Sequence, residues 1–159
     1  MNKLVVLVCV LMLSGCAIAP YIPLPGGESA TIDYVVNNSG AGSFALAIFE
    51  GENCTTPKMI ADGAKAPQGV STIVANVRIP TGRSISFLAA DIGSTAYCAA
   101  PFEFAPEANK SYVVTYQHSN ASCSATVAYR SDEQLLPEST FRPLRYKEPT
   151  FASSPFCEK

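Results

Sequence analysis

The stretch that decides the fold is residues 111–131, SYVVTYQHSNASCSATVAYRS. In its first half, aromatic and aliphatic side chains recur at every second position, as Tyr112, Val114 and Tyr116. In its second half the same period appears in Cys123, Ala125, Val127 and Tyr129. A period of two is typical of β-strands, whose successive side chains point to opposite faces. With the polar turn at residues 117–122 between the two halves, the stretch predicts an antiparallel hairpin.

The same period extends outward along the chain. It appears at residues 30–36, 44–49, 73–79, 84–90 and 97–104, with turn residues between the runs. The run 44–49 is apolar on both faces, which favours an interior strand. Residues 58–61 predict a short edge strand ended by Asp62 and Gly63, with a loop at residues 64–69. The fold class is therefore all-β, an antiparallel β-sandwich of seven to nine short strands, immunoglobulin-like or transthyretin-like in outline.

A turn at residues 106–110 precedes the hairpin. It begins with Pro106, ends with Lys110 and is followed closely by Tyr112. This arrangement resembles the tyrosine corner of immunoglobulin-like sandwiches, which implies a structural role for Tyr112.

The N-terminus carries the features of a secretory signal. Lys3 is followed by about ten apolar residues, too short to span a bilayer as a helix, and then by Leu13-Ser14-Gly15-Cys16. These four residues resemble the lipobox of bacterial lipoproteins. The resemblance implies that residues 1–15 are removed, that Cys16 is joined to a diacylglycerol, and that its new amino group is acylated, as with palmitate. Ala17 in place of Asp implies the outer membrane, periplasmic side, although surface exposure stays open.

Three segments are therefore predicted: a signal peptide at residues 1–15, a lipidated tether at 16–27 and a single domain at 28–159. The tether contains three prolines and ends in Gly26 and Gly27, so it is either an extended spacer or an edge segment packed onto the domain. The tail from residue 140 is too apolar to be free and is interrupted by prolines. It is expected to form an extended strap pinned by Cys157.

The cysteines point to an oxidising compartment. Cys9 leaves with the signal and Cys16 takes the lipid, which leaves four cysteines: Cys54, Cys98, Cys123 and Cys157. An even number in an exported chain predicts two disulfides. Pairing of sequence neighbours, Cys54 with Cys98 and Cys123 with Cys157, is the favoured arrangement among three. CxxC spacing is absent from the mature sequence, so no metal site and no cofactor are predicted.

The sequence offers few groups for catalysis. His118 is the only histidine and falls in the predicted turn, where an imidazole is usually solvated. The carboxylates that lie close in sequence, Glu50 with Glu52 and Glu103 with Glu107, fit solvated surface better than a hydrolase pair. We therefore expect no enzyme.

One constellation has binding character. Tyr112, Tyr116 and Tyr129 lie on the facing strands of the hairpin and would form an aromatic platform for sugars if they were exposed. The alternative is that they fill the core with their hydroxyls at its rim.

The leading hypothesis is a non-enzymatic envelope lipoprotein, held in the membrane by its lipid, that binds a protein, peptidoglycan or another polysaccharide. Loss of Lys3 with the signal changes the net charge from −2 to −3, which argues against nucleic acid as a partner. Two alternatives stay open. One is a periplasmic inhibitor of a foreign enzyme such as lysozyme, acting through the loop at residues 51–57. The other is a secretion-system assembly lipoprotein.

Overall fold

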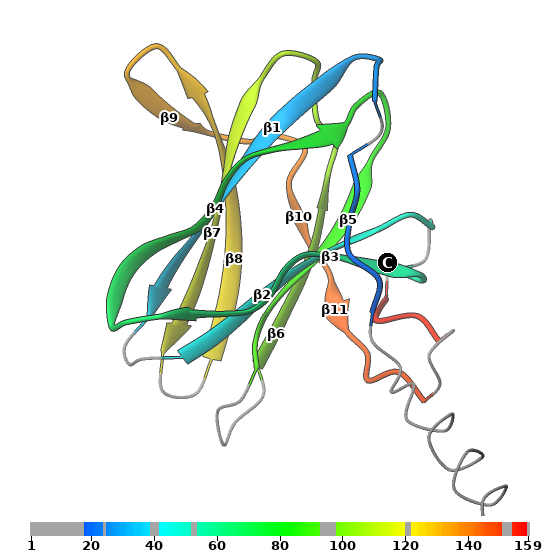
Figure 1. Cartoon of the computed structure of the whole chain (residues 1–159), viewed down its shortest axis with the longest axis vertical. Helices are drawn as coiled ribbons and strands as arrows, with labels where there is room; N and C mark the ends of the chain where they lie inside the picture. Colours follow the sequence, from blue (N-terminus) through cyan, green and yellow to red (C-terminus); the bar gives the residue numbers. More distant parts are fainter. Residues whose placement is uncertain are drawn as a thin grey trace, which may run out of the picture.

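Two β-sheets packed face to face make up the protein (Figure 1). The computed structural model describes residues 18–23, 25–38, 42–51, 54–92, 98–119, 122–150 and 154–158. The strands are β1 (Ser29–Asn38), β2 (Gly42–Phe49), β3 (Pro57–Ala66), β4 (Gly69–Pro80), β5 (Ile85–Asp91), β6 (Cys98–Phe104), β7 (Ser111–Ser119), β8 (Ser122–Ser131), β9 (Gln134–Pro137), β10 (Arg142–Pro143), β11 (Arg145–Tyr146) and β12 (Cys157–Glu158).

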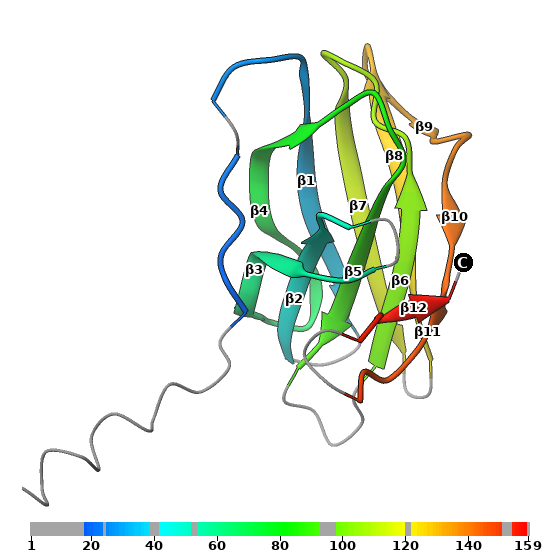
Figure 2. The same cartoon turned by 90° about the vertical axis from the view of Figure 1, so that its right-hand side faces the viewer.

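Sheet 1 has the strand order β4-β1-β7-β8-β9, and sheet 2 has the order β10-β6-β5-β2-β3. Figure 2 shows the two layers and the chain crossing repeatedly between them. Every pairing between neighbours in these sheets is antiparallel except that of β1 with β7, which is parallel. The predicted all-β sandwich is confirmed. The nine strands β1–β9 build its body, and β10, β11 and β12 are two-residue pairings in the C-terminal tail.

The core is built from the inward-facing side chains at every second position of both sheets. Residues that pair across neighbouring strands lie side by side, so the core is divided along the strands into successive layers, each of which we call a rung. On sheet 2 the inward pairs are Ile85 with Phe104, Phe87 with Phe102, Ala89 with Ala100, and Asp91 with Cys98. On sheet 1 they are Tyr112 with Tyr129, Val114 with Val127, Tyr116 with Ala125, and His118 with Cys123. Three of the four rungs are aromatic or aliphatic. The last one, at the lower end in Figure 1, is polar and carries two cysteines.

Strand β3 is longer than the sequence predicts. It continues through Gly63 to Ala66, where a break and a loop were expected. The register against β2 shifts at this point, so that one extra residue is accommodated opposite Ala45. Gly63 takes a φ of 60°, which only glycine adopts without strain and which is typical of a β-bulge. The Asp-Gly pair therefore bends the strand instead of ending it.

The predicted tyrosine corner is confirmed. The Tyr112 hydroxyl accepts a hydrogen bond from the backbone amide of Glu107, five residues upstream, at 2.9 Å. The Tyr112 ring lies 5.0 Å from that of Phe104, centroid to centroid, across the two sheets. The corner thus fixes the crossing from β6 in sheet 2 to β7 in sheet 1.

We expect Tyr112→Phe to lower the free energy of unfolding in urea by about 1 kcal/mol, because the ring stays while the bond to the Glu107 amide is lost. Tyr129→Phe is the matched control on the facing strand and should change stability by less than about 0.5 kcal/mol. Equal effects of the two variants would mean that the corner adds nothing beyond ring packing.

The disulfides join Cys54 to Cys157 and Cys98 to Cys123. The predicted pairing of sequence neighbours is wrong. Cys98 begins β6 and Cys123 lies near the start of β8, so both face inward at one end of the sandwich and bridge the two sheets. Cys54 follows β2 and meets the last strand of the tail, 103 residues away. Sequence spacing could not choose among the pairings, because the choice depends on which strands lie opposite each other.

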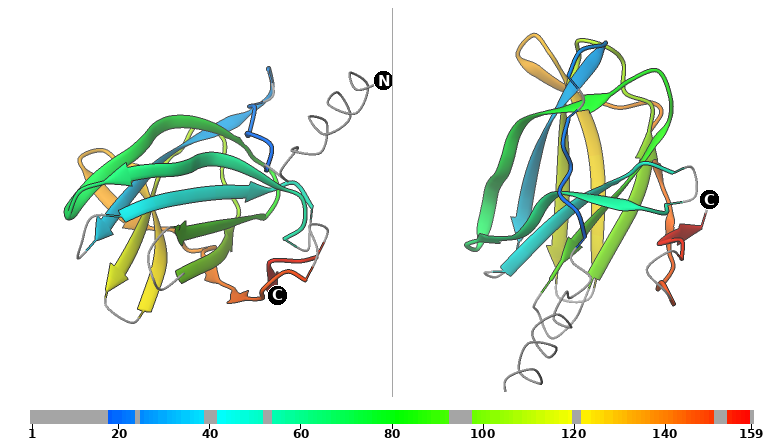
Figure 3. Two further views of the ribbon diagram at one scale, coloured as in Figure 1. Left: turned by 60° about the horizontal axis from the view of Figure 1, so that its bottom comes forward. Right: turned by 45° about the vertical axis from the view of Figure 1, so that its right-hand side comes forward.

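The C-terminal tail covers the outer face of sheet 2. In both views of Figure 3 the orange and red segment follows one side of the molecule. β10 pairs with β6, β11 pairs with β12, and the Phe156 amide donates to the Cys54 carbonyl at 3.0 Å. Beneath the tail lies a second apolar cluster of buried residues: Ala47, Phe49, Cys54, Leu88 and Cys157. The tail is therefore a strap that shields outward-facing apolar side chains of β2 and β5.

Removing both cysteines of the longer disulfide, in Cys54→Ser/Cys157→Ser, should release this strap. The chain-entropy model gives a loss of about 4.7 kcal/mol for a loop of this size. Limited trypsin digestion followed by mass spectrometry should show cleavage at Lys147 before cleavage in the sandwich. The double variant Cys98→Ser/Cys123→Ser removes the other disulfide and should leave Lys147 protected under native conditions. Equal protection of Lys147 in both variants would show that the strap is held without its disulfide.

The N-terminal segment lies against the edge of sheet 2. The Met59 amide donates to the Ala19 carbonyl at 3.0 Å, and the Tyr21 amide donates to the Met59 carbonyl at 2.8 Å. The tether was predicted to be either an extended spacer or an edge segment packed onto the domain. Residues 19–21 form an edge segment.

Candidate functional site

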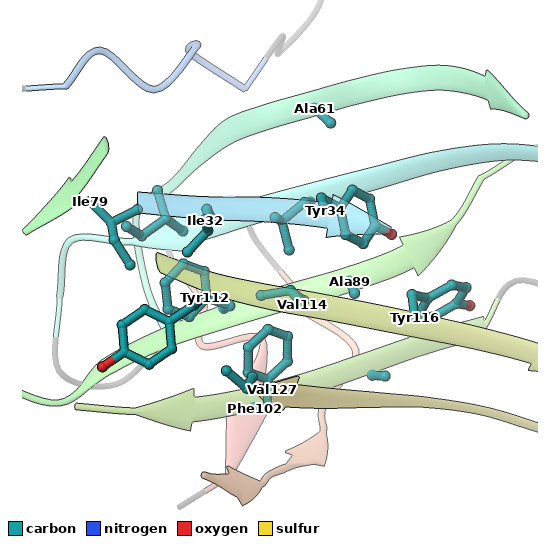
Figure 4. Close-up of a cluster of buried hydrophobic side chains, with 14 of the residues drawn as sticks. Ile32, Tyr34, Ala61, Ile79, Ala89, Phe102, Tyr112, Val114, Tyr116 and Val127 are labelled. Carbon is teal, nitrogen blue, oxygen red and sulfur yellow. The ribbon is translucent and has the colours of Figure 1, made fainter. Parts of the chain in front are cut away.

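The three tyrosines proposed as a platform do not form one. Tyr112 and Tyr116 are 0% exposed, and Figure 4 shows both among the buried side chains between the sheets. Tyr129 is partly buried against the same core, and the Lys110 ammonium lies 4.3 Å from its ring centroid in a cation–π contact. The structure therefore places Tyr112 and Tyr116 in the core, the alternative that the sequence left open.

The polar rung at the end of the core holds a buried contact between a histidine and an aspartate on opposite sheets. The His118 Nδ1 donates to Asp91 Oδ2 at 3.0 Å. The Asp91 side chain is 3% exposed and that of His118 is 15% exposed. Asp91 Oδ1 has no hydrogen-bond partner within the described residues. The contact with Asp91 fixes the imidazole through its Nδ1 nitrogen.

His118 was expected in a solvated turn, and this expectation is wrong. β7 continues to Ser119, so His118 lies in the strand and takes the next inward position after Tyr112, Val114 and Tyr116. The polar residues around His118 in the sequence are typical of a turn and do not indicate this. Asp91 was not singled out from the sequence at all. The available signal was that Asp91 continues the alternation of β5 inward, where an acidic side chain needs a partner.

The Cys98–Cys123 disulfide belongs to the same rung. Asp91 lies directly opposite Cys98 on β5 and β6, and His118 lies directly opposite Cys123 on β7 and β8. The His118–Asp91 contact and the disulfide both cross from sheet 2 to sheet 1, so the four residues form a closed ring of contacts. We call this ring the polar rung.

Two tyrosine hydroxyls lie next to the polar rung. Tyr116 donates to the Cys98 carbonyl at 3.1 Å, and Tyr34 donates to the Ala45 carbonyl at 3.1 Å. Burial raises the pKa of the Tyr116 hydroxyl far above its ordinary value, and the nearby Asp91 carboxylate raises it further. Burial likewise raises the pKa of Tyr34, with smaller contributions from Tyr116 and Asp91. Both hydroxyls therefore stay protonated in the folded protein at neutral pH.

A cleft of about 290 Å³ opens at the other end of the sandwich, beside the N-terminal segment. Its apolar lining comes from Ile48, Phe49, Ile79 and Ile85, and its charged lining comes from Glu28, Glu50, Arg78 and Arg83. The Tyr21 hydroxyl donates to the Arg78 carbonyl at 3.0 Å, which holds the N-terminal segment over one wall. Ile22, 76% exposed, also lines the cleft.

The acidic residues noted in the sequence are not brought together. Glu103 on β6 binds Arg142 of the strap at 3.0 Å, whereas Glu107 binds Lys110 in the turn at 2.8 Å. Glu50 lines the cleft, and Glu52 lies outside the described residues. Within the described part of the chain there is no group of three or more His, Cys, Asp or Glu side chains placed to hold a metal ion.

Cys16 and the rest of the lipobox lie outside the described residues. Among the residues that are described, no helix has the length and apolarity needed to cross a bilayer. In comparisons with known proteins, no family model, no curated protein and no solved structure matches the chain.

The buried tyrosines predict a specific alkaline behaviour. Their folded-state pKa values lie above the value of about 10 in the unfolded chain, so stability is retained below pH 10 and lost as pH rises further. Each tyrosine that stays protonated only when folded should make the free energy of unfolding fall by about 1.4 kcal/mol per pH unit. Tyr116→Phe should therefore make this fall shallower by that amount, measured by urea unfolding between about pH 10 and 11. An unchanged slope would contradict the assignment.

Proposed function

We propose that the chain is a lipid-anchored envelope protein that acts as a non-enzymatic binding module on the periplasmic side of the outer membrane. The observation that carries this proposal is the pairing of all four cysteines beyond Cys16 into two disulfides. Such pairing is typical of oxidising compartments. With Cys9 removed in the signal, Cys16 is the one thiol left in the mature chain, as a lipobox requires.

The N-terminal contacts support a domain held close to the lipid. Ala19 pairs with Met59 only three residues after Cys16, so an extended connection reaches no more than about 11 Å. A free tether of residues 17–27 would allow roughly three times that distance. In the proposed function, the β3 edge and the cleft beside Tyr21 therefore face a partner near the membrane surface.

The cleft supports a protein partner over a polysaccharide. Its volume is near the lower end of the range for small-molecule sites, and aliphatic side chains line much of it. An apolar side chain flanked by charges fits such a site, with Arg78 and Arg83 opposite acidic groups of the partner. Long glycans are usually bound on exposed aromatic faces, and Tyr112 and Tyr116 are withdrawn into the core.

A second candidate, inhibition of a foreign enzyme such as lysozyme, rests on the loop between β2 and β3. Cys54 and Thr56 both take positive φ values, 51° and 56°, which are strained for residues other than glycine. The disulfide to Cys157 holds this loop against the strap. A backbone held in place at Cys54 and Thr56 would occupy an enzyme cleft with less reordering than a free chain. A third candidate is a role as a secretion-system assembly lipoprotein, which is supported only by the proposed lipid anchor at Cys16.

Cys16→Ala should move the protein from the membrane to the soluble envelope fraction and remove the mass of the acyl groups from the intact protein. One acyl chain gives only marginal membrane binding, whereas a multiply acylated cysteine gives stable anchoring. The measurement is fractionation with intact-mass spectrometry. Cys9→Ala is the matched control, because that thiol lies in the segment to be removed, and it should change neither result.

Crosslinking of wild-type and Cys16→Ala protein in the native envelope then tests the binding module. A partner captured only by the anchored protein, and lost in Arg78→Glu/Arg83→Glu, would support binding through the cleft. Capture that is unaffected by the double charge reversal would contradict the cleft as the binding site. An unacylated, soluble wild-type protein would contradict the anchor.

A further inference from the structure

The two disulfides lie in very different surroundings. Cys54 and Cys157 are 0% and 4% exposed and are packed among Phe49, Leu88 and other apolar groups. Cys98 and Cys123 are only partly buried, and two ionisable side chains lie on neighbouring strands of their own rung. Access and nearby charge are the two conditions that make a disulfide exchange with thiols.

The charges of the polar rung are distributed unequally over its two sulfurs. Residues directly opposite each other on an antiparallel pair have Cβ atoms about 4.5–5.5 Å apart and share a face. The imidazole of His118 is therefore the neighbour of Cys123, and the carboxylate of Asp91 is the neighbour of Cys98. A thiolate is stabilised beside an imidazolium and disfavoured beside a carboxylate.

We propose that Cys98–Cys123 is a thiol-exchange site that reacts with a dithiol reductant, with His118 serving Cys123 as the leaving group. The thiolate of the reductant attacks Cys98 Sγ, and a mixed disulfide forms there. The electron pair of the broken S–S bond leaves on Cys123 Sγ, where protonated His118 stabilises the charge and donates a proton. The second thiolate of the reductant then attacks its own sulfur in the mixed disulfide and releases Cys98, which takes a proton from water. Two electrons pass from the dithiol to the protein.

Asp91 is a positioning residue in this scheme. Its Oδ2 accepts from His118 Nδ1, which orients the ring beside the strand position of Cys123. Among the residues that the structure describes, the other titratable groups facing this region are Tyr116 on the same strand as His118 and Tyr34 on β1, both of which stay protonated at neutral pH. Of the side chains in the rung, the imidazole is the one whose chemistry suits proton transfer to a thiolate.

The test uses the mature protein with both disulfides intact. Wild type and His118→Asn are treated with dithiothreitol from about pH 5.5 to 8.5, quenched in acid, alkylated and mapped by peptide mass spectrometry. The Asn side-chain amide can still donate to Asp91, so the carboxylate is not left unpaired. Rates are expressed per concentration of reductant thiolate. In wild type, reduction of Cys98–Cys123 should be about tenfold faster at the acid end of the range than in His118→Asn, and the two should converge at the alkaline end. The rate for Cys54–Cys157 should be the same in both proteins.

Two results would overturn the proposal. One is an identical pH profile in the two proteins, and the other is faster reduction in His118→Asn, which would mean that His118 only shields the disulfide.

A second measurement does not depend on any variant. Brief treatment of wild type with glutathione should place the mixed disulfide mainly on Cys98 and leave Cys123 free for alkylation. Equal labelling, or glutathione mainly on Cys123, would contradict the assigned direction of attack. Neither measurement depends on whether Cys16 is acylated.

Discussion

The sandwich depends on the contacts that join its two sheets at the polar rung, the end of the core where the inward-facing side chains are no longer apolar. Asp91 lies almost fully buried there, and an isolated buried carboxylate is among the most destabilising groups a core can hold. His118 offsets that cost from the opposite sheet, while the Cys98–Cys123 bond, closing 25 residues, contributes about 3.5 kcal/mol in the chain-entropy model. Breaking such a buried pair from one side typically costs 3–5 kcal/mol. The polar rung thus stabilises the fold while placing reactive groups at its rim.

The opposite surface of sheet 2 raises a different problem. Strands β2 and β5 are apolar on both faces, so a two-layer sandwich would leave Ala47, Phe49 and Leu88 in water. The strap solves it by supplying a partial third layer, in which the Phe156 ring lies 5.7 Å from that of Phe49. The Cys54–Cys157 bond is buried inside that layer. Each disulfide therefore secures one face of sheet 2, one toward the core and one toward the strap.

Period-two patterning was sufficient to predict strands β1, β2 and β4–β8, including the hairpin of β7 and β8, but it did not predict β9. The turn from Pro106 to Lys110 indicated the corner at Tyr112, because a corner depends on residues close in sequence. Period-two patterning failed where distant segments decide the outcome. The disulfide pairing depends on which strand ends meet, and the parallel contact of β1 with β7 is invisible in local sequence. The prediction of a solvated turn at His118 was wrong, because its polar neighbours in the sequence indicated a turn. His118 lies two positions after Tyr116 and therefore faces inward with it. The sequence predicts that the strand at residues 58–61 ends at Asp62 and Gly63, whereas these two residues form a β-bulge.

The spacing of the cysteines along the chain has a consequence for how the protein matures. A chain that emerges N-terminus first exposes Cys54 and Cys98 before either native partner is present. The earliest bond open to these two cysteines is therefore a non-native one, and Cys54 must wait until Cys157, 103 residues later, has emerged. Correct maturation thus calls for slow oxidation or for rearrangement by disulfide exchange. Without a catalyst, such rearrangement takes roughly minutes to hours.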